Sequence, residues 1–121
     1  MNTLVTLDID AVAATLFGKR FPLENEIGTQ AAIFEALRAK FGGLVEREAP
    51  APGGRIDFAV ADIGVEVKLK GQPAAIIRQC TRYLNDRRFA GLVLVTAKLV
   101  ALPPMVCGKP CRVVNLGAAW L

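Results

Sequence analysis

The sequence predicts a single α/β domain, residues 1–121, in which helices flank a mixed central β-sheet. A length of 121 residues fits one domain. The predicted elements follow the order helix, three strands, helix, strand, strand. The run Gly91–Ala97 is almost entirely apolar, which is typical of a strand covered on both faces. These observations favour a meander of three strands, to which the strand after the second helix adds in parallel by a crossover.

Apolar spacing and end signals predict two long helices. The first spans Glu24–Phe41 and ends at Gly42-Gly43. Pro73 suits the first turn of the second helix. The apolar stripe expected on the first helix consists of Ile27, Ala31, Phe34, Leu37 and Phe41. The stripe expected on the second consists of Ile76, Cys80, Tyr83 and Leu84.

The remaining elements are shorter. A helix is predicted through Ala11–Phe17, capped by either Asp8 or Asp10. Proline and glycine mark a loop at Ala49–Gly54, and Leu99–Met105 reads as an apolar, proline-containing connection. The predicted strands are Leu44–Glu48, Arg55–Ala61, Gly64–Leu69, Gly91–Ala97 and Arg112–Leu116.

The second and third strands are expected to form a hairpin with a two-residue turn at Asp62-Ile63. Because side chains alternate across a strand, the apolar residues of both strands share one side of the sheet and the charged residues the other. The pairs that this register predicts are Val60 with Val65, Ala59 with Glu66, and Asp57 with Lys68.

Asp57, Glu66 and Lys68 therefore converge on one surface. One interpretation is a solvated face on which Lys68 pairs with Asp57 across the strands. The other is a metal site. Glu26, at the start of the long helix, can point toward the sheet, and Gln79 lies one turn into the second helix.

The amino-acid composition limits which catalytic residues the protein could use. The formal net charge is +4 and the chain has no histidine, which excludes histidine-dependent triads and nucleases and most catalytic zinc sites. Catalysis would have to use carboxylates, lysine, hydroxyls or an oxygen-bound metal. Three cysteines without the spacing of a zinc site favour reduced thiols in a cytoplasmic protein. No apolar run reaches the roughly 18 residues of a membrane span, and no secretory signal is expected.

The apolar content of 53% is high for a domain of this size. The stretches LVALPPMV (residues 99–106) and GAAWL (residues 117–121) are too apolar for free exposure to water. Since exposed apolar patches usually mark contacts, we expect a homodimer.

The segments ENEIGTQAAIFEALRAKFGG, GGRIDFAVADIGVEVKLKG and AAIIRQCTRYL together carry a family resemblance. Their motif residues, in chain order, are Glu26, Asp57, Glu66, Val67, Lys68 and Gln79. The set resembles the PD-(D/E)xK nuclease superfamily, which has the restriction-endonuclease-like fold, over roughly residues 24–97. Its architecture is most similar to Holliday junction resolvases of the archaeal type and to VRR-type nuclease domains, which often show Glu and Gln four residues apart, as Glu26 and Gln30 stand here. Isoleucine precedes Asp57 where the family has proline, and Glu24 could take the role of Glu26.

The resemblance implies a Mg²⁺ site, with Mn²⁺ as a substitute. Its ligands would be Asp57, Glu66 and the backbone carbonyl of Val67, with Glu26 binding directly or through water. Lys68 would orient or activate the attacking water and stabilise developing negative charge. Gln79 and Arg82 would hold the scissile strand or its phosphate. The basic residues proposed to contact DNA phosphates are Arg78, Arg82, Arg87 and Arg88, a set that is equally consistent with a solvated helix flank.

Three functions follow, in decreasing order of preference. The first is a metal-dependent endodeoxyribonuclease acting on branched or duplex DNA as a homodimer. The second is a non-catalytic nucleic-acid-binding or assembly module of the same fold. The third is an interaction protein whose apolar edges bind partners and whose charges only face solvent.

Overall fold

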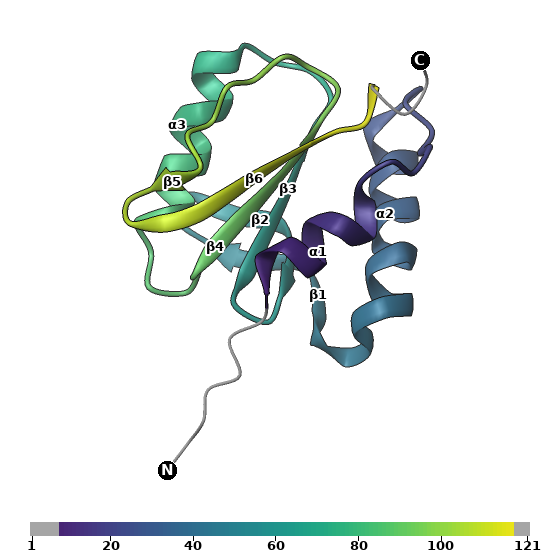
Figure 1. Ribbon diagram of the computed structural model, residues 1–121, viewed down its shortest axis with the longest axis horizontal. Helices are drawn as coiled ribbons and strands as arrows, with labels where there is room; N and C mark the ends of the chain where they lie inside the picture. Colours follow the sequence, from purple (N-terminus) through teal and green to yellow (C-terminus); the bar gives the residue numbers. More distant parts are fainter. Residues whose placement is uncertain (1–7, 118–121) are drawn as a thin grey trace.

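A mixed six-stranded sheet flanked by three α-helices forms the core of the protein, which confirms the predicted α/β class (Figure 1). The computed structural model describes residues 8–117. The strand order is β1-β2-β3-β4-β6-β5. Strands β1 to β3 pair antiparallel, whereas β3, β4 and β6 run parallel to one another. The meander and the parallel addition after the second long helix are therefore as predicted.

Each helix begins at a residue suited to that position. In α1 (Ile9–Leu16), the Asp10 N–H donates to the Asp8 carboxylate at 2.9 Å, so Asp8 is the cap. In α2 (Glu26–Phe41), the Asn25 side chain accepts from the Gly28 N–H at 2.6 Å. This cap starts α2 two residues later than predicted, because the capping residue itself has extended backbone. Helix α3 (Pro73–Leu84) starts at its proline, as expected.

The strands correspond to the predicted ones, with three corrections. Strand β6 begins at Lys109 and not at Arg112, because Lys109 and Pro110 pair with β5. Strand β1 runs on through Ala51 into the stretch expected to be a loop, because it pairs with β2 as far as Gly54. A two-residue strand, β5, lies within the proline-containing connection and pairs with β6. The bounds are β1 (Val45–Ala51), β2 (Gly54–Val60), β3 (Ile63–Lys68), β4 (Gly91–Thr96), β5 (Met105–Val106) and β6 (Lys109–Asn115).

Helices α1 and α2 cover one face of the sheet, and α3 covers the other (Figure 1). All six residues of β4 are buried, as the apolar run predicted. The core on the first face includes Phe58, Val60 and Val65, packed with residues of both helices. The core on the α3 face holds the predicted stripe of α3, all of it buried.

The buried stripe of α2 differs from the predicted one. Its buried residues are Thr29, Ile33 and Leu37, whereas Ile27 is 83% exposed. The Thr29 hydroxyl donates to the Asn25 carbonyl at 3.0 Å and also to the Pro22 carbonyl, so burial leaves it satisfied. Apolar spacing alone therefore predicted the wrong buried face for the first turn of this helix.

The β2–β3 hairpin has a register shifted by two residues from the predicted one. Val60 pairs with Ile63, so the turn is Ala61-Asp62, and Ala61 has a φ of +54°. Ile63 is 1% exposed, and placing it in the turn would have lost its burial in the core. A shift of two preserves which face each side chain occupies. The shift changes which residues lie opposite each other across the two strands, so that Asp57 lies opposite Glu66 and not Lys68.

Within residues 8–117, no helix has both the length and the apolar character that are needed to cross a membrane.

Packing around Gly64 of β3 provides a test of this core. A Cβ at Gly64 would lie 2.7 Å from the Ile56 Cδ1 atom and 3.2 Å from that of Leu92. We expect Gly64→Ala to lower the free energy of unfolding by about 1–3 kcal/mol, since overpacking forces neighbours to move. Urea denaturation measures the change. Gly43→Ala is the matched control, because a Cβ there meets nothing within 4 Å, and an equal loss in both variants would contradict the packing described.

Candidate active site

The carboxylates of Asp57 and Glu66 lie next to each other where the regular ladder between β2 and β3 ends. The Asp57 N–H donates to Glu66 Oε1 at 3.1 Å. The Val67 N–H donates to Asp57 Oδ2 at 2.7 Å. Each carboxylate thus accepts a backbone N–H of the opposite strand, in the place of a ladder carbonyl. These reciprocal bonds fix both acids between the two strands.

A break in side-chain alternation brings Asp57 into this position. Phe58 belongs to the core beneath α1 and α2, and regular alternation would place Ile56 beside it. Ile56 lies instead in the core beneath α3. The break falls at Asp57, opposite Glu48 of β1, which has a φ of +48°. As a result the Asp57 carboxylate turns toward the backbone of β3.

On the α3 side, hydrogen bonds and a lysine surround Glu66. The Tyr83 hydroxyl donates to Glu66 Oε2 at 3.1 Å, and Gln79 Nε2 donates to the Tyr83 oxygen at 2.7 Å. The Lys68 ammonium lies 3.7 Å from the same Glu66 oxygen. The Glu66 side chain is only 4% exposed and that of Lys68 29% exposed. The lysine therefore links a buried acid to the solvent.

On the α2 side, an amide and a third acid approach the pair. Gln30 Nε2 donates to Asp57 Oδ1 at 3.2 Å. Glu26 Oε1 accepts from the Leu69 N–H at 3.2 Å, just past the end of β3. Glu26 thus points toward the sheet, as expected from its place at the start of the helix. Its charge contributes to raising the pKa of Asp57.

Both carboxyl groups of the pair hold their protons more tightly than usual. Burial, followed by the charge of Asp57, raises the pKa of Glu66 to about 8. Burial is also the main cause that raises the pKa of Asp57, against the lowering effect of the Val67 N–H. Lys68 lowers both, but as the weakest of the causes. The surroundings therefore favour the protonated form of each acid over its charged form.

The arrangement can hold a hard cation through the Asp57–Glu66 pair. Each carboxylate oxygen has a further acceptor position beyond the hydrogen bond that it accepts. Mg²⁺ is commonly bound by one or two carboxylates together with water. In the described part of the chain, no three acidic, cysteine or histidine side chains gather into a metal cluster, so Glu26 is not part of a closed triad with the pair. The bond to Asp57 holds the peptide of Val67 beside the acids.

The four arginines do not form one cluster. Arg78 is exposed on α3, and Arg82, one turn further on, has its guanidinium beside Gly53 in the β1–β2 turn. Arg88 donates to the Ala61 carbonyl at 2.7 Å, in the β2–β3 turn, and pairs with Glu46. These two turns lie at opposite ends of β2. Arg87 is exposed between α3 and β4.

Sequence reasoning assigned no role in the site to Tyr83. It was counted only as part of the apolar stripe of α3, yet its hydroxyl bonds Glu66, Gln79 and the Arg55 carbonyl. A tyrosine within a buried stripe needs a polar partner, and this requirement was the available signal. Gln30 was noted for its spacing from Glu26, but its bond to Asp57 depends on how α2 lies on the sheet.

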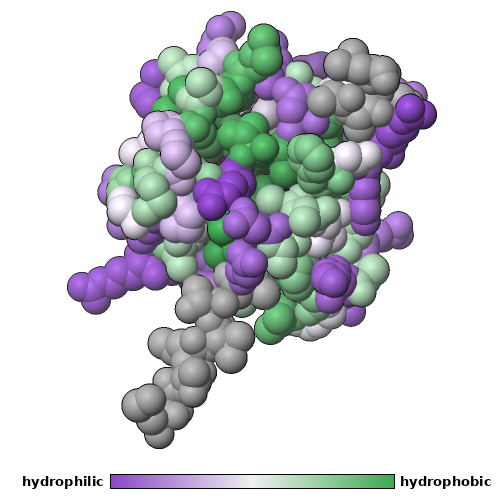
Figure 2. All heavy atoms as spheres, viewed as in Figure 1, coloured by the Kyte–Doolittle hydropathy of each residue, from purple (hydrophilic) through white to green (hydrophobic). Residues whose placement is uncertain are grey.

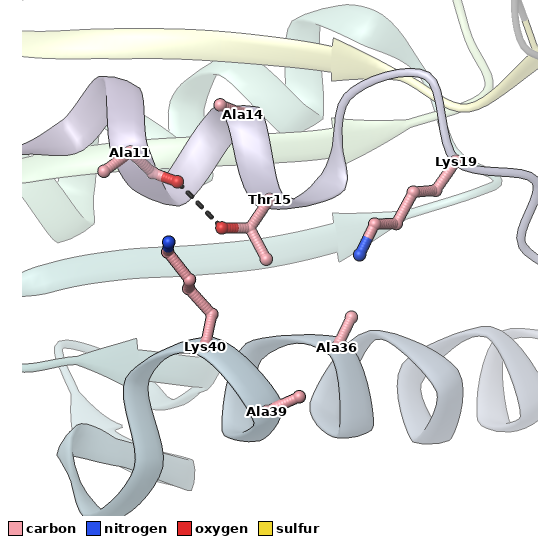
Figure 3. A pocket seen from close by; sticks show the side chains of 7 residues that line it. All are labelled: Ala11, Ala14, Thr15, Lys19, Ala36, Ala39 and Lys40. Carbon is pink, nitrogen blue, oxygen red and sulfur yellow. Dashed lines mark hydrogen bonds between the residues drawn. The ribbon is translucent and has the colours of Figure 1, made fainter.

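Two of the cavities in the described part of the chain matter for the site. One, of about 510 Å³, is a groove between α1 and α2 with an alanine floor and with Lys19 and Lys40 at its rim (Figure 3). No acid lines it, and it lies apart from the Asp57–Glu66 pair. The other, of about 500 Å³, lies at the ends of β3 and β4 and includes Glu26 and Lys68 in its wall. Only the second of these is continuous with the candidate site.

Comparisons with protein-family models, with curated proteins and with solved structures found no match. The nuclease resemblance therefore stays a prediction that depends on this chain's own residues.

The raised pKa of Glu66 predicts how stability changes with pH in buffer free of divalent metal. The unfolded group has a pKa near 4.5, so between about pH 5 and pH 8 the folded state keeps a proton that the unfolded state releases. This contribution to stability is present at low pH and is lost as the pH rises through the folded pKa. We expect it to amount to roughly 1–3 kcal/mol in urea denaturation.

The contribution is isolated by comparing variants at each pH. Glu66→Gln should be more stable than the wild type above about pH 8, and the difference should shrink as the pH falls. Glu35→Gln, on the exposed face of α2, should keep the wild-type profile. A Glu66→Gln profile parallel to that of the wild type would show that Glu66 is ionised normally.

Proposed function

We propose that the protein is a metal-dependent endodeoxyribonuclease that uses Asp57, Glu66 and Lys68. The observation that carries the proposal is the reciprocal pair of carboxylates, Glu66 buried and Asp57 half-buried, with a lysine at its solvent side. A pair of apolar residues at this point would stabilise the sheet at lower cost, because buried like charges are unfavourable. Groups kept at such a cost are candidates for chemistry.

A divalent cation fits the charge at this site. Burial is the main cause that raises the pKa of both acids, and Lys68 offsets it only in part, so a bound cation would favour their ionised forms. When bound, Mg²⁺ or Mn²⁺ would stabilise negative charge on a phosphodiester and lower the pKa of a water. Asp57 and Glu66 would hold it, with the Val67 carbonyl and Glu26 as the further ligands proposed from the sequence.

The remaining side chains position these groups. Tyr83 and Gln79 hold the Glu66 carboxylate in one orientation, and Gln30 does the same for Asp57. Lys68, partly exposed, can hold the attacking water with its ammonium group and stabilise charge on the phosphate. Arg78 and Arg82 would contact the DNA backbone from the exposed side of α3. Arg88 is engaged at the far turn, so its contribution to DNA binding would be smaller.

The order of elements supports the finer fold assignment that we propose, a restriction-endonuclease-like domain. Helix α2, the β1–β3 meander, α3 and β4 follow one another as the resemblance implies. The two acids stand on the second and third of these strands. The fold alone does not specify an activity, so the proposal depends on the site and not on the architecture.

One observation favours a second function, a nucleic-acid-binding module without catalysis. All four oxygens of Asp57 and Glu66 already accept hydrogen bonds. In this alternative the acids serve to close the open end of the hairpin. Such a protein would retard DNA in a gel without metal, and its affinity would depend steeply on salt concentration.

Neither alternative assigns the protein to a cellular compartment, and the cytoplasmic location stays a prediction.

Cleavage assays test the proposed activity. With Mg²⁺ or Mn²⁺, the protein should cut plasmid and four-way-junction DNA, and chelation should stop the reaction. Asp57→Asn, Glu66→Gln and Lys68→Ala should each lower the rate by about 100-fold or more, because each removes charge stabilisation at the reacting phosphate. The control is Glu35→Gln, which removes an exposed acid from α2. Full cleavage by Asp57→Asn would refute the site.

We also propose that two copies associate through the segment that precedes β5. Leu99 is 92% exposed and Met105 54% exposed, whereas Val100 and Leu102 pack on the α3-side core. Figure 2 shows apolar side chains gathered on the face that includes this segment. A second copy would bring a second site, which cutting both strands of a duplex or junction requires.

Light scattering at several protein concentrations tests the dimer. The wild type should have twice the mass of one chain, and Leu99→Asp should be monomeric because it places a charge in the apolar contact. Leu44→Asp is the matched control, since Leu44 is 52% exposed beside β1, at the other edge of the sheet. A monomeric wild type, or loss of the dimer in both variants, would contradict the assigned surface.

A further inference from the structure

The cavity beside the candidate site is formed by three chain-distant segments. They are the turn before α2, the end of β3 with the residues that follow it, and the residue after β4. In Figure 1, the ends of β3 and β4 and the start of α2 lie at the same end of the molecule. The lining residues are Leu23, Glu24, Asn25, Glu26, Lys68, Leu69, Lys70, Gly71 and Ala97. Two of them, Glu26 and Lys68, also belong to the candidate site.

We infer that this cavity takes one unpaired nucleotide of the DNA, next to the scissile phosphate. This inference deepens the proposed function and rests on it for the position of that phosphate. The volume of about 500 Å³ is within the range of small-ligand pockets. A base within a duplex is stacked and paired, so it must leave the helix to enter a cavity of this kind.

The lining of the cavity offers contacts both to the base of a nucleotide and to its phosphates. Leu23, Leu69 and Ala97 are half-buried and apolar, which gives a base a surface on which to lie. Lys68 and Lys70 supply two cations for the phosphates on either side of it. Asn25 and Glu24 add polar groups able to meet the edge of a base. An acidic ligand without an apolar part would leave the three apolar residues without a role.

The hydrogen bond between Glu26 and the Leu69 N–H fixes the position of the cavity relative to the acids. Leu69 follows Lys68 directly, and its N–H donates to Glu26 Oε1 at 3.2 Å. Helix α2 is thereby tied to the chain that leaves β3, between the cavity and the Asp57–Glu66 pair. A nucleotide in the cavity would set the register of the DNA strand relative to the acids. The substrate class is then DNA with an unpaired nucleotide at the cleavage point, such as a splayed arm or flap.

Binding to an inactive protein tests the cavity without requiring cleavage. The Asp57→Asn variant is titrated with labelled DNA that is fully paired, that carries one flap, or that carries the same flap with an abasic nucleotide at each position in turn. We expect the flap to bind roughly tenfold more tightly than the paired duplex, and one abasic position to lose that gain. Ala97→Trp, which fills the cavity, and Lys70→Ala should each reduce binding of the flap. Ala97→Trp should have no effect on DNA that is abasic at the sensitive position.

Lys98→Ala is the control, since Lys98 adjoins Ala97 but does not line the cavity. Equal affinity for flap and paired DNA would overturn the inference. So would equal binding by the Ala97→Trp and Lys70→Ala variants and their parent, with folding of each verified by its thermal transition. If the wild type cleaves DNA while these variants bind normally, the cavity assignment alone fails. If they bind flaps poorly but the wild type cleaves nothing, the nuclease proposal alone fails.

Discussion

The placement of two carboxyl groups side by side within the sheet, Glu66 buried and Asp57 half-buried, is the constraint on which the rest of this structure depends. Burying one unpaired carboxylate costs roughly several kcal/mol of free energy, and burying two side by side costs more. Groups from four elements offset this cost: backbone N–H groups of β2 and β3, Tyr83 of α3, Gln30 of α2 and the ammonium of Lys68 on β3. Even so, the pKa of Glu66 stays raised. The surroundings orient the acids more completely than they neutralise them.

This imbalance connects stability with the proposed chemistry. A site that fully neutralised its acids would have no affinity left for a cation, whereas a site that left them unoriented could not hold one in a fixed place. Here the orientation comes mainly from neutral donors, and the acids keep raised pKa values that a bound cation would lower. Natural proteins commonly accept local instability of this kind where function requires it. The cavity lies at the ends of the parallel strands β3 and β4, and Glu26 and Lys68 belong both to its lining and to the candidate site.

Much of the local structure could be predicted because it depends on nearby residues. Pro73 marks the first turn of α3, and the apolar run of β4 required burial on both faces. The prediction failed where distant packing decided. Ile27 has helical spacing but lies on a different side of α2 from the buried Thr29, Ile33 and Leu37, so it is exposed. The hairpin turn moved because Ile63 is buried in a core built by other elements.

The sequence by itself determined the order of helices and strands, the absence of histidine chemistry, and the presence of Asp57, Glu66 and Lys68 on one hairpin. These follow from residue type and from periods of two and 3.6 residues, which are local properties. Only the tertiary structure decided that Asp57 stands opposite Glu66, that Tyr83 bonds Glu66, and that a cavity includes Glu26 and Lys68 in its wall. Each of these depends on strand register and helix placement, which are set by how residues far apart in the chain share one core.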